Sequence, residues 1–464
     1  MSQKQARRRS PWVILSLVTL VLLVACSSAT SSGTTADSVT DGSSTEASAA
    51  GDESTPVAEV EPATAEPSPT VTPEEESAPE PTEEPTAEAA DQAEATAPEP
   101  TATPPADGIF RVDDRPDRLR FVTDSWGTNW ELHTIDYEEI LSGGPPRDGI
   151  PSIDNPQFIT PDEAAEWLVD NEPVIVVDLN GDARAYPLQI LIWHEIVNDT
   201  VGDQPVVVTF CPLCNSAIAF DRIVNGETFE FGTSGLLRNS DLVMYDRTTE
   251  TLWQQFTGEA IVGDLVGTQL TFLPSAIVSF SDFREAHPDG VVLSRDTGQQ
   301  RPYGQNPYAG YDTIGQNPFL FTGVIDGRLA AMERVIAVSL DEADVAYPLS
   351  ILAEVGVIND NLGSQDIVVF HKEGASSALG AQLIAAAEDV GATGVFDPNL
   401  DGQKLTFSKQ DGQIVDAETG STWNILGQAV DGPLAGQELT PIIHGDHFWF
   451  SWAAFRPDTI IYEG

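Results

Sequence analysis

The sequence predicts an α+β fold that is rich in β-strands and built from two homologous halves. Short runs with apolar residues at every second position recur along the chain, as in Val174–Leu179 and Val206–Phe210, and such runs indicate strands. From Val174 onward the chain also repeats itself, which indicates an internal duplication. The clearest helix spans Leu188–Val197. Strands in irregular succession around one helix favour an α+β fold over a doubly wound parallel sheet.

Residues 1–26 are predicted to be a lipoprotein signal peptide. Lys4 and three arginines precede the apolar stretch Val13–Ala25, which is short for a membrane span and typical of an export signal. The stretch ends in Leu23-Val-Ala-Cys26, which resembles the bacterial lipobox and makes Cys26 the expected lipidation site. We therefore expect an extracytoplasmic protein, lipid-anchored to the cell membrane, or to the outer membrane if the cell has one. An uncleaved anchor helix is the alternative.

Residues 27–107 are predicted to be a disordered tether. This segment is rich in Ser, Thr, Ala, Pro and Glu, and it contains 19 acidic residues and no lysine or arginine. It has too little apolar surface to offset its ordering entropy, and its like charges extend it. From Gly108 onward, 54 acidic residues outnumber 18 basic ones, a net charge of −36. Such a surface argues against nucleic acid or an anionic membrane surface as a partner.

The folded part divides into four segments. Residues 108–173 are expected to pack on the core, and Thr160-Pro-Asp-Glu163 predicts a short helix with a capping box. Residues 174–293 form the predicted first half, and residues 335–464 form the predicted second half. Residues 294–334, rich in Gly, Pro and Tyr, connect the halves without a periodic pattern. Long ordered connections are often functional, although a plain linker is the alternative.

The repeat is visible as motifs that recur in the same order. Ala185-Tyr-Pro-Leu188 returns as Ala346-Tyr-Pro-Leu349, and the pair Asp246 and Trp253 matches Asp416 and Trp423. Such duplicated halves are expected to pack about a pseudo-two-fold axis, as an isologous dimer does.

Cys211-Pro-Leu-Cys214 carries the clearest chemistry. These are the only thiols of the predicted folded part, and they follow the predicted strand Val206–Phe210 on a tight turn. Two thiols at this spacing form either a reducible disulfide or a pair of thiolate ligands for a soft metal. Because an exported chain of this length does not need a disulfide scaffold, the pair favours function over structure.

His194 is the candidate partner of the thiols. Trp193-His194-Glu195 and the cysteine pair each occur in the first half only, so they represent specialisation rather than shared packing. A neutral imidazole beside two thiolates suits zinc or copper and leaves an open coordination position. The alternative is a buried histidine bonded to a backbone carbonyl. His371, aligned by sequence with Cys211, is a further candidate that approaches from the second half.

Several motifs resemble one known family. They are Ser142-Gly-Gly-Pro-Pro-Arg-Asp-Gly-Ile-Pro151, Ala185–Leu188, Trp193-His-Glu-Ile-Val-Asn-Asp199, Phe210-Cys-Pro-Leu-Cys214, Tyr245-Asp-Arg247 and Ser294-Arg-Asp-Thr-Gly298. From about Arg120 to the C-terminus the chain resembles the bacterial and archaeal family called domain of unknown function 3179. The resemblance supports the segment boundaries and the pairing of His194 with the cysteines. It implies no mechanism, because the family has no established activity.

The leading hypothesis is a membrane-tethered lipoprotein that binds copper or zinc through Cys211, Cys214 and possibly His194. Glu195 and Arg222 are expected to surround these ligands and orient them without binding the metal themselves. A thiol–disulfide redox protein using the same cysteines is the first alternative. Against it, the residues after Cys214 read as a strand, whereas a thioredoxin-like site has a helix there. The second alternative is a non-catalytic ligand-binding or adhesion module with a structural disulfide.

Overall fold

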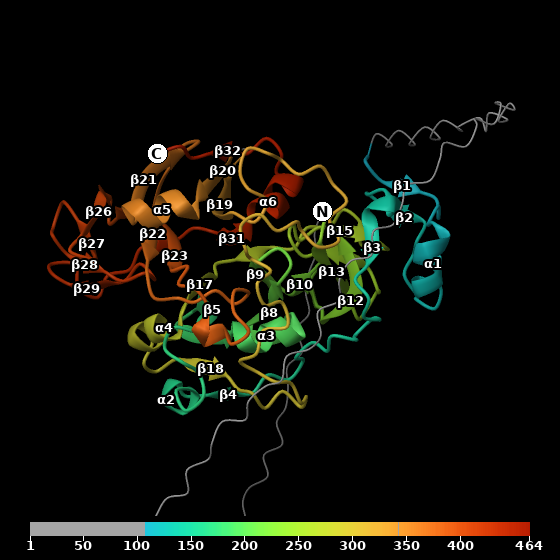
Figure 1. The fold of residues 1–464 in the computed structure, drawn as a ribbon, viewed down its shortest axis with the longest axis horizontal. Helices are drawn as coiled ribbons and strands as arrows, with labels where there is room; N and C mark the ends of the chain where they lie inside the picture. The colour runs from blue at the N-terminus through green and yellow to red at the C-terminus, as the bar shows by residue number, and fades with distance from the viewer. Residues whose placement is uncertain (1–106, 342) are drawn as a thin grey trace, which may run out of the picture. The chain divides into compact units, whose positions relative to one another are not determined.

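The computed structural model describes residues 107–341 and 343–464 (Figure 1). The predicted signal peptide, Cys26 and all but the last residue of the predicted tether lie outside the described residues. Within the described ranges, no helix has the length and apolar character needed to cross a membrane.

Residues 108–173 form short elements that extend the sheets of the first half. They are β1 (Phe110–Arg111), α1 (Asp117–Thr123), β2 (Leu132–His133), η1 (Tyr137–Glu139), β3 (Ile140–Ser142), β4 (Phe158–Ile159) and α2 (Pro161–Ala164). The capping box of α2 is present: the Thr160 hydroxyl accepts from the Glu163 N–H, and the Glu163 carboxylate accepts from the Thr160 N–H.

The first half consists mainly of antiparallel strands. Its elements are β5 (Pro173–Leu179), β6 (Asp182–Pro187), α3 (Leu188–His194), β7 (Ile196–Val201), β8 (Gln204–Cys211), β9 (Ser216–Asp221), β10 (Ile223–Val224), β11 (Glu227–Thr228), β12 (Phe231–Arg238), β13 (Asp241–Asp246), β14 (Leu252–Gln254), β15 (Ala260–Val262), β16 (Phe272–Leu273), β17 (Ala276–Ser279), α4 (Phe280–Ala286) and β18 (Val291–Leu293).

The second half presents a similar succession. Its elements are β19 (Arg334–Leu340), β20 (Ala343–Pro348), α5 (Leu349–Val355), β21 (Val357–Leu362), β22 (Gln365–Lys372), η2 (Ile384–Ala386), β23 (Ala392–Asp397), β24 (Asn399–Leu400), β25 (Gln403–Lys404), β26 (Phe407–Gln410), β27 (Gln413–Asp416), β28 (Thr422–Trp423), β29 (Ala429–Asp431), β30 (Thr440–Pro441), β31 (His444–Phe448), α6 (Trp449–Phe455) and β32 (Ile460–Ile461). With few and short helices, the described chain confirms the predicted β-rich class.

The sheets of the two halves have corresponding strand orders. β17-β5-β6-β18 corresponds to β31-β19-β20-β32, and β16-β9-β8-β7 corresponds to β30-β23-β22-β21. In each half one pair is parallel, β6 with β18 and β20 with β32. Strands β5 to β8 contain seven, six, six and eight residues, and β19 to β22 repeat these lengths.

The two halves contact each other through reciprocal strands. β17 of the first half lies against β23 of the second, and β31 of the second lies against β9 of the first (Figure 1). The apolar core crosses this contact, since the cluster around Phe210 and Phe220 also contains Leu379, Phe448 and Phe450. The halves therefore share buried surface.

Most predicted elements agree with the structure, with two local differences. The predicted strands Val174–Leu179, Ala183–Tyr186, Val206–Phe210 and Leu242–Tyr245 lie within β5, β6, β8 and β13. The predicted strand Thr228–Phe231 is wrong, because β11 ends at Thr228 and β12 begins at Phe231. The predicted helix Leu188–Val197 stops at His194, since Glu195 has a positive φ of 59° and the next residues join β7.

Candidate metal centre

The two cysteines lie on the tight turn that joins β8 to β9. Cys211 ends β8 and pairs with Ser216, which begins β9. The Cys214 N–H donates to the Cys211 carbonyl at 3.3 Å, and Asn215 has a left-handed φ of 52°, which asparagine tolerates better than most residues. Both thiols are free and buried. We call Cys211–Asn215 the thiol turn.

Strand β31 of the second half forms hydrogen bonds with the thiol turn. The Phe448 N–H donates to the Cys214 carbonyl at 3.0 Å. The Asn215 side-chain amide donates to the Asp446 carbonyl at 3.2 Å. The position of the thiols therefore depends on contact between the halves.

Asp241 is the third group at the thiols. A ligand atom from each of Cys211, Cys214 and Asp241 lies within 4.8 Å of the other two, and all three residues are buried. Oδ2 of Asp241 accepts hydrogen bonds from the Gln254 side chain at 2.6 Å and the Phe256 N–H at 2.9 Å. Oδ1 is buried and accepts no hydrogen bond from a nitrogen or oxygen donor, and the two thiols are the donors that interact with this carboxylate. A buried carboxylate oxygen without a nitrogen or oxygen donor is costly, so this atom is available to a cation.

Burial dominates the electrostatics of the three groups. It raises the pKa of Asp241 to about 7, although hydrogen bonds from Gln254 and Phe256 oppose this rise. Burial also raises the pKa of both thiols, and the nearby charge of Asp241 adds to the effect. The metal-free thiols therefore stay protonated at neutral pH, and a bound cation would displace their protons.

Asp241 was missed by the sequence interpretation, although the repeat contains a signal for it. The hairpin β12–β13 has strands of eight and six residues, whereas the corresponding β26–β27 has four and four. Asp241 lies in the part that only the first half possesses. The comparison of halves that isolated the cysteine pair also isolates this extension.

His194 does not join this group. One ring nitrogen, Nδ1, lies 2.7 Å from the Pro151 carbonyl, and Nε2 lies 2.7 Å from the Tyr303 hydroxyl. The ring is fully buried, and burial lowers its pKa. This geometry corresponds to the alternative of a histidine bonded to a carbonyl, and it places Asp241 in the ligand group where His194 was expected.

The end of α3 binds the connection between the halves. In addition to the contact of His194 with Tyr303, the Trp193 indole N–H donates to the Gln305 carbonyl at 3.2 Å. Two neighbouring side chains of α3 thus hold the connection at Tyr303–Gln305. Their role in the structure is to position this segment.

The connection then passes over the thiols. Tyr308 and Tyr311 pack against the core cluster that contains both cysteines. The Tyr311 hydroxyl accepts from the Phe319 N–H at 3.1 Å, and the Ser240 hydroxyl donates to the Phe319 carbonyl. Tyr308 and Tyr311 form what we call the aromatic cover.

Sequence comparison identifies the family of the chain. The sequence model described as "Protein of unknown function (DUF3179)" matches residues 147–459. The chain belongs to the DUF3179 family. The matched range contains the thiol turn, Asp241, α3 and the connection. Comparison with curated proteins and with solved structures found no match. The chemistry of the candidate site in this DUF3179 chain is therefore inferred from the residues of the chain alone.

Arg222 makes its hydrogen bonds outside the candidate metal centre of the DUF3179 chain. Its guanidinium donates to the Phe229 carbonyl at 2.9 Å and to the Asp199 carbonyl at 2.8 Å. These bonds brace the segment after β9, and they give no support to the expectation that Arg222 backs the ligands.

His371 is also absent from the group, and its sequence alignment with Cys211 is off by one residue. Ladder registers make His371 equivalent to Phe210 and Lys372 equivalent to Cys211. A shift of one residue turns a side chain to the opposite face of a sheet. The Nε2 atom of His371 instead lies 3.3 Å from the Val390 carbonyl.

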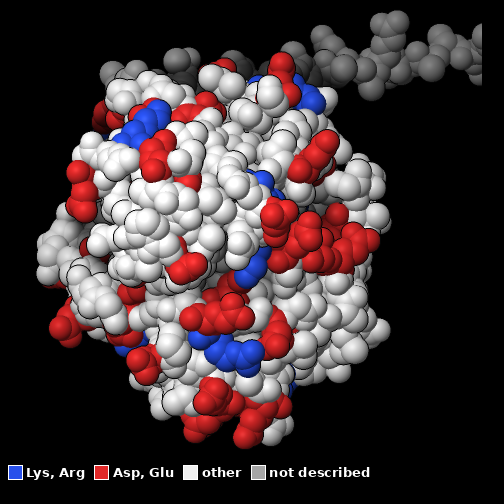
Figure 2. All heavy atoms as spheres, turned by 90° about the vertical axis from the view of Figure 1, so that its left-hand side faces the viewer, with Lys and Arg blue, Asp and Glu red and all other residues white. Residues whose placement is uncertain are grey.

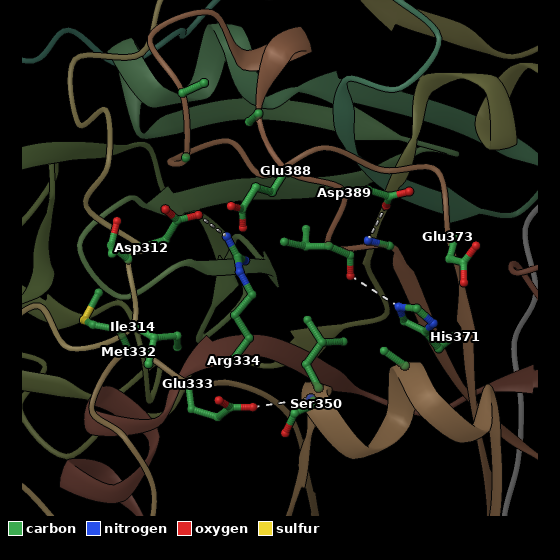
Figure 3. A pocket seen from close by; sticks show the side chains of 18 of the residues that line it. Asp312, Ile314, Met332, Glu333, Arg334, Ser350, His371, Glu373, Glu388 and Asp389 are labelled. Carbon is green, nitrogen blue, oxygen red and sulfur yellow. Dashed lines mark hydrogen bonds and ion pairs between the residues drawn. The ribbon is translucent and has the colours of Figure 1, made fainter.

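His371 lines a separate cavity of about 910 Å³ in the second half (Figure 3). Acidic side chains dominate its charged lining, namely Asp312, Glu333, Glu373, Glu388 and Asp389, with Arg334 as the one arginine. Arg334 donates to the Ser377 hydroxyl at 2.8 Å and lies 3.5 Å from Asp312. No cysteine lines this cavity, and it is distinct from the candidate metal centre.

Proposed function

We propose that this DUF3179 protein is a lipid-anchored, extracytoplasmic protein that binds zinc or copper through Cys211, Cys214 and Asp241. The observation that carries the proposal is Oδ1 of Asp241, which is buried beside two free thiols and accepts no hydrogen bond from a nitrogen or oxygen donor. Thiolate and carboxylate are both common zinc ligands. A cation in this position supplies the charged partner that Oδ1 lacks.

The environment of the thiols favours a metal over thiol–disulfide exchange. An attacking cysteine needs a substantial thiolate fraction, and burial raises the pKa of both thiols here. Strand β9 follows the thiol turn, whereas a thioredoxin-like site has a helix there that lowers the pKa of the attacking cysteine. A metal ion, by contrast, stabilises thiolates directly.

We further propose that the halves arose by duplication and pack about a pseudo-two-fold axis. The corresponding strand orders, equal strand lengths and reciprocal contacts of β17 with β23 and β31 with β9 support this. The Asp246–Trp253 bond and its counterpart Asp416–Trp423 both measure 3.0 Å. On this basis the metal centre is built from two features that only the first half has, the thiol turn and the extended hairpin β12–β13.

The location proposal rests on the N-terminal sequence. The lipobox-like Leu23–Cys26 supports lipidation at Cys26, and the acidic segment 27–107 supports a tether between membrane and folded part. Acidic side chains outnumber basic ones on the face seen in Figure 2. This surface disfavours nucleic acid as a partner.

The test is metal analysis combined with thiol protection on the purified full chain. After loading with Zn²⁺ or Cu⁺ and desalting, about one metal ion per chain is expected. Mass spectrometry of tryptic peptides separates alkylation of Cys211 and Cys214 from that of Cys26. Metal should protect both thiols in the wild type, whereas Asp241→Asn should weaken protection by about 10–100-fold. Reversible disulfide formation without metal binding would favour the redox alternative, and a permanent disulfide would favour the structural one.

A further inference from the structure

Glu195 ends helix α3 in a backbone conformation that suits glycine. Its φ is 59° and its ψ is −30°. The corresponding helix α5 ends at Gly356, with a φ of 76° and a ψ of −27°. In both helices the terminal N–H donates to a carbonyl four residues earlier at 2.7 Å. Positive φ is costly for a residue with a Cβ and free of that cost for glycine, so the first half tolerates a strained glutamate.

The Glu195 side chain is buried near the metal centre. It is 8% exposed, and no hydrogen bond or ion pair within the described ranges engages its carboxyl group. The Glu195 carbonyl accepts from the Phe210 N–H at 2.8 Å, directly before Cys211. Burial and the charge of Asp241 raise the pKa of Glu195 to about 8. The charge of Glu195 in turn contributes to the raised pKa of Cys211.

A strained backbone and a largely buried carboxyl group without a hydrogen bond to protein at one residue point to a role for its side chain. Ending the helix does not explain the glutamate, because Gly356 ends the corresponding helix α5 without strain. The carboxyl group itself must therefore account for the residue, and the charged groups near it are those of the metal centre.

We infer that Glu195 is the fourth protein ligand of the metal centre, and that it makes the site selective for a divalent cation over Cu⁺. This inference rests on the proposed function. Two thiolates and two carboxylates give a four-ligand set that Zn²⁺ accepts, whereas Cu⁺ prefers soft thiolate and thioether ligands. Glu195 is not part of the group formed by Cys211, Cys214 and Asp241, whose ligand atoms lie within 4.8 Å of one another. Its three side-chain torsions allow the carboxylate to approach once a cation offsets the repulsion from Asp241.

The test measures Co²⁺, Zn²⁺ and Cu⁺ affinity of the full chain, with Co²⁺ absorption reporting coordination. Two variants are compared, Glu195→Gln and Glu195→Gly, the latter inserting the residue of the second half. Each should weaken Co²⁺ and Zn²⁺ binding by at least about 10-fold and change the Co²⁺ spectrum, with Cu⁺ affinity changed less than about threefold. Glu195→Gly should also raise the thermal midpoint of the metal-free chain, because it removes strain.

Gly356→Glu is the matched control. It should lower the thermal midpoint and leave Co²⁺ binding unchanged, because it introduces the same strain away from the thiols. Wild-type affinity and an unchanged spectrum in Glu195→Gly would overturn the ligand role while leaving the proposed function intact. Binding of Cu⁺ but neither Co²⁺ nor Zn²⁺ by the wild type would also overturn it. Failure of the wild type to bind any of the three metals would instead overturn the proposed function.

Discussion

The Nε2 atom of His194 lies 2.7 Å from the hydroxyl oxygen of Tyr303, and this contact joins α3 to the connection between the halves. Because the Pro151 carbonyl can only accept, Nδ1 of His194 donates a hydrogen bond to it. Nε2 is therefore the acceptor, and the Tyr303 hydroxyl is the donor. The histidine expected to bind metal therefore positions the segment whose aromatic residues cover the thiols.

Removing this contact should expose the thiols without removing a ligand. A hydrogen bond contributes about 0.5–1.5 kcal/mol, so Tyr303→Phe should increase alkylation of Cys211 and Cys214 in the metal-free chain by about 2–10-fold. Metal affinity should change little. Tyr347→Phe, which removes the 2.9 Å bond to Asp360 in the second half, is the control and should leave alkylation unchanged. A loss of metal affinity in Tyr303→Phe matching that of Asp241→Asn would contradict the positioning role.

The metal-free chain should lose stability as pH rises from about 4 to about 7. The folded-state pKa of Asp241 is raised from 3.8 to about 7, so the folded state retains a proton that the unfolded state has released. Stability is therefore fully present below pH 4 and declines as pH rises through 7. The effect is on the order of a few kcal/mol. Urea unfolding with a chelator at pH 5 and pH 8 measures it.

Asp241→Asn supplies the comparison for this pH dependence. The amide does not titrate, so the difference in unfolding free energy between pH 5 and pH 8 should shrink. Adding Zn²⁺ at pH 8 should stabilise the wild type more than the variant, because the variant binds the metal more weakly. An identical pH dependence in both proteins would show that Asp241 does not titrate as described.

The two halves should not be stable as separate fragments. Their core cluster is continuous across the β9–β31 contact, and separation would expose Phe448 and Phe450. Limited proteolysis should leave a fragment extending from about residue 108 to residue 464. Co-expressed fragments divided near Arg301 should remain soluble only together. Two independently folded fragments, each with its own cooperative thermal transition, would contradict the shared core.

Cys26→Ser should prevent lipid attachment and therefore release the protein from the membrane or block its maturation. A single acyl chain gives weak anchoring, and stable anchoring needs further attachment, so the loss of all chains should be evident. Membrane fractionation and mass spectrometry of the N-terminal peptide measure the result. Cys211→Ser in the same assay should remain lipidated. Lipid still present on Cys26→Ser would show that the lipobox interpretation is wrong.

The sequence by itself was sufficient for several of the longer strands, the tight turn after β8 and the β-rich class. Alternation of apolar residues, turn residues and capping residues act over a few neighbouring positions, so β5, β8 and the α2 capping box were predictable from local patterns. The comparison of the two predicted halves also singled out Cys211 and Cys214 as candidate site residues, and their function stays a prediction.

Only the tertiary structure decided which side chains accompany these thiols. Asp241 reaches Cys211 because the extended hairpin β12–β13 packs against the thiol turn, and no local pattern encodes that distance. His194 faces Pro151 and Tyr303 because two loops that are distant in the sequence pack beside α3, and no local pattern encodes that packing. His371 was misaligned because ladder register depends on hydrogen bonds between strands, and a shift by one residue reverses the face on which a side chain lies.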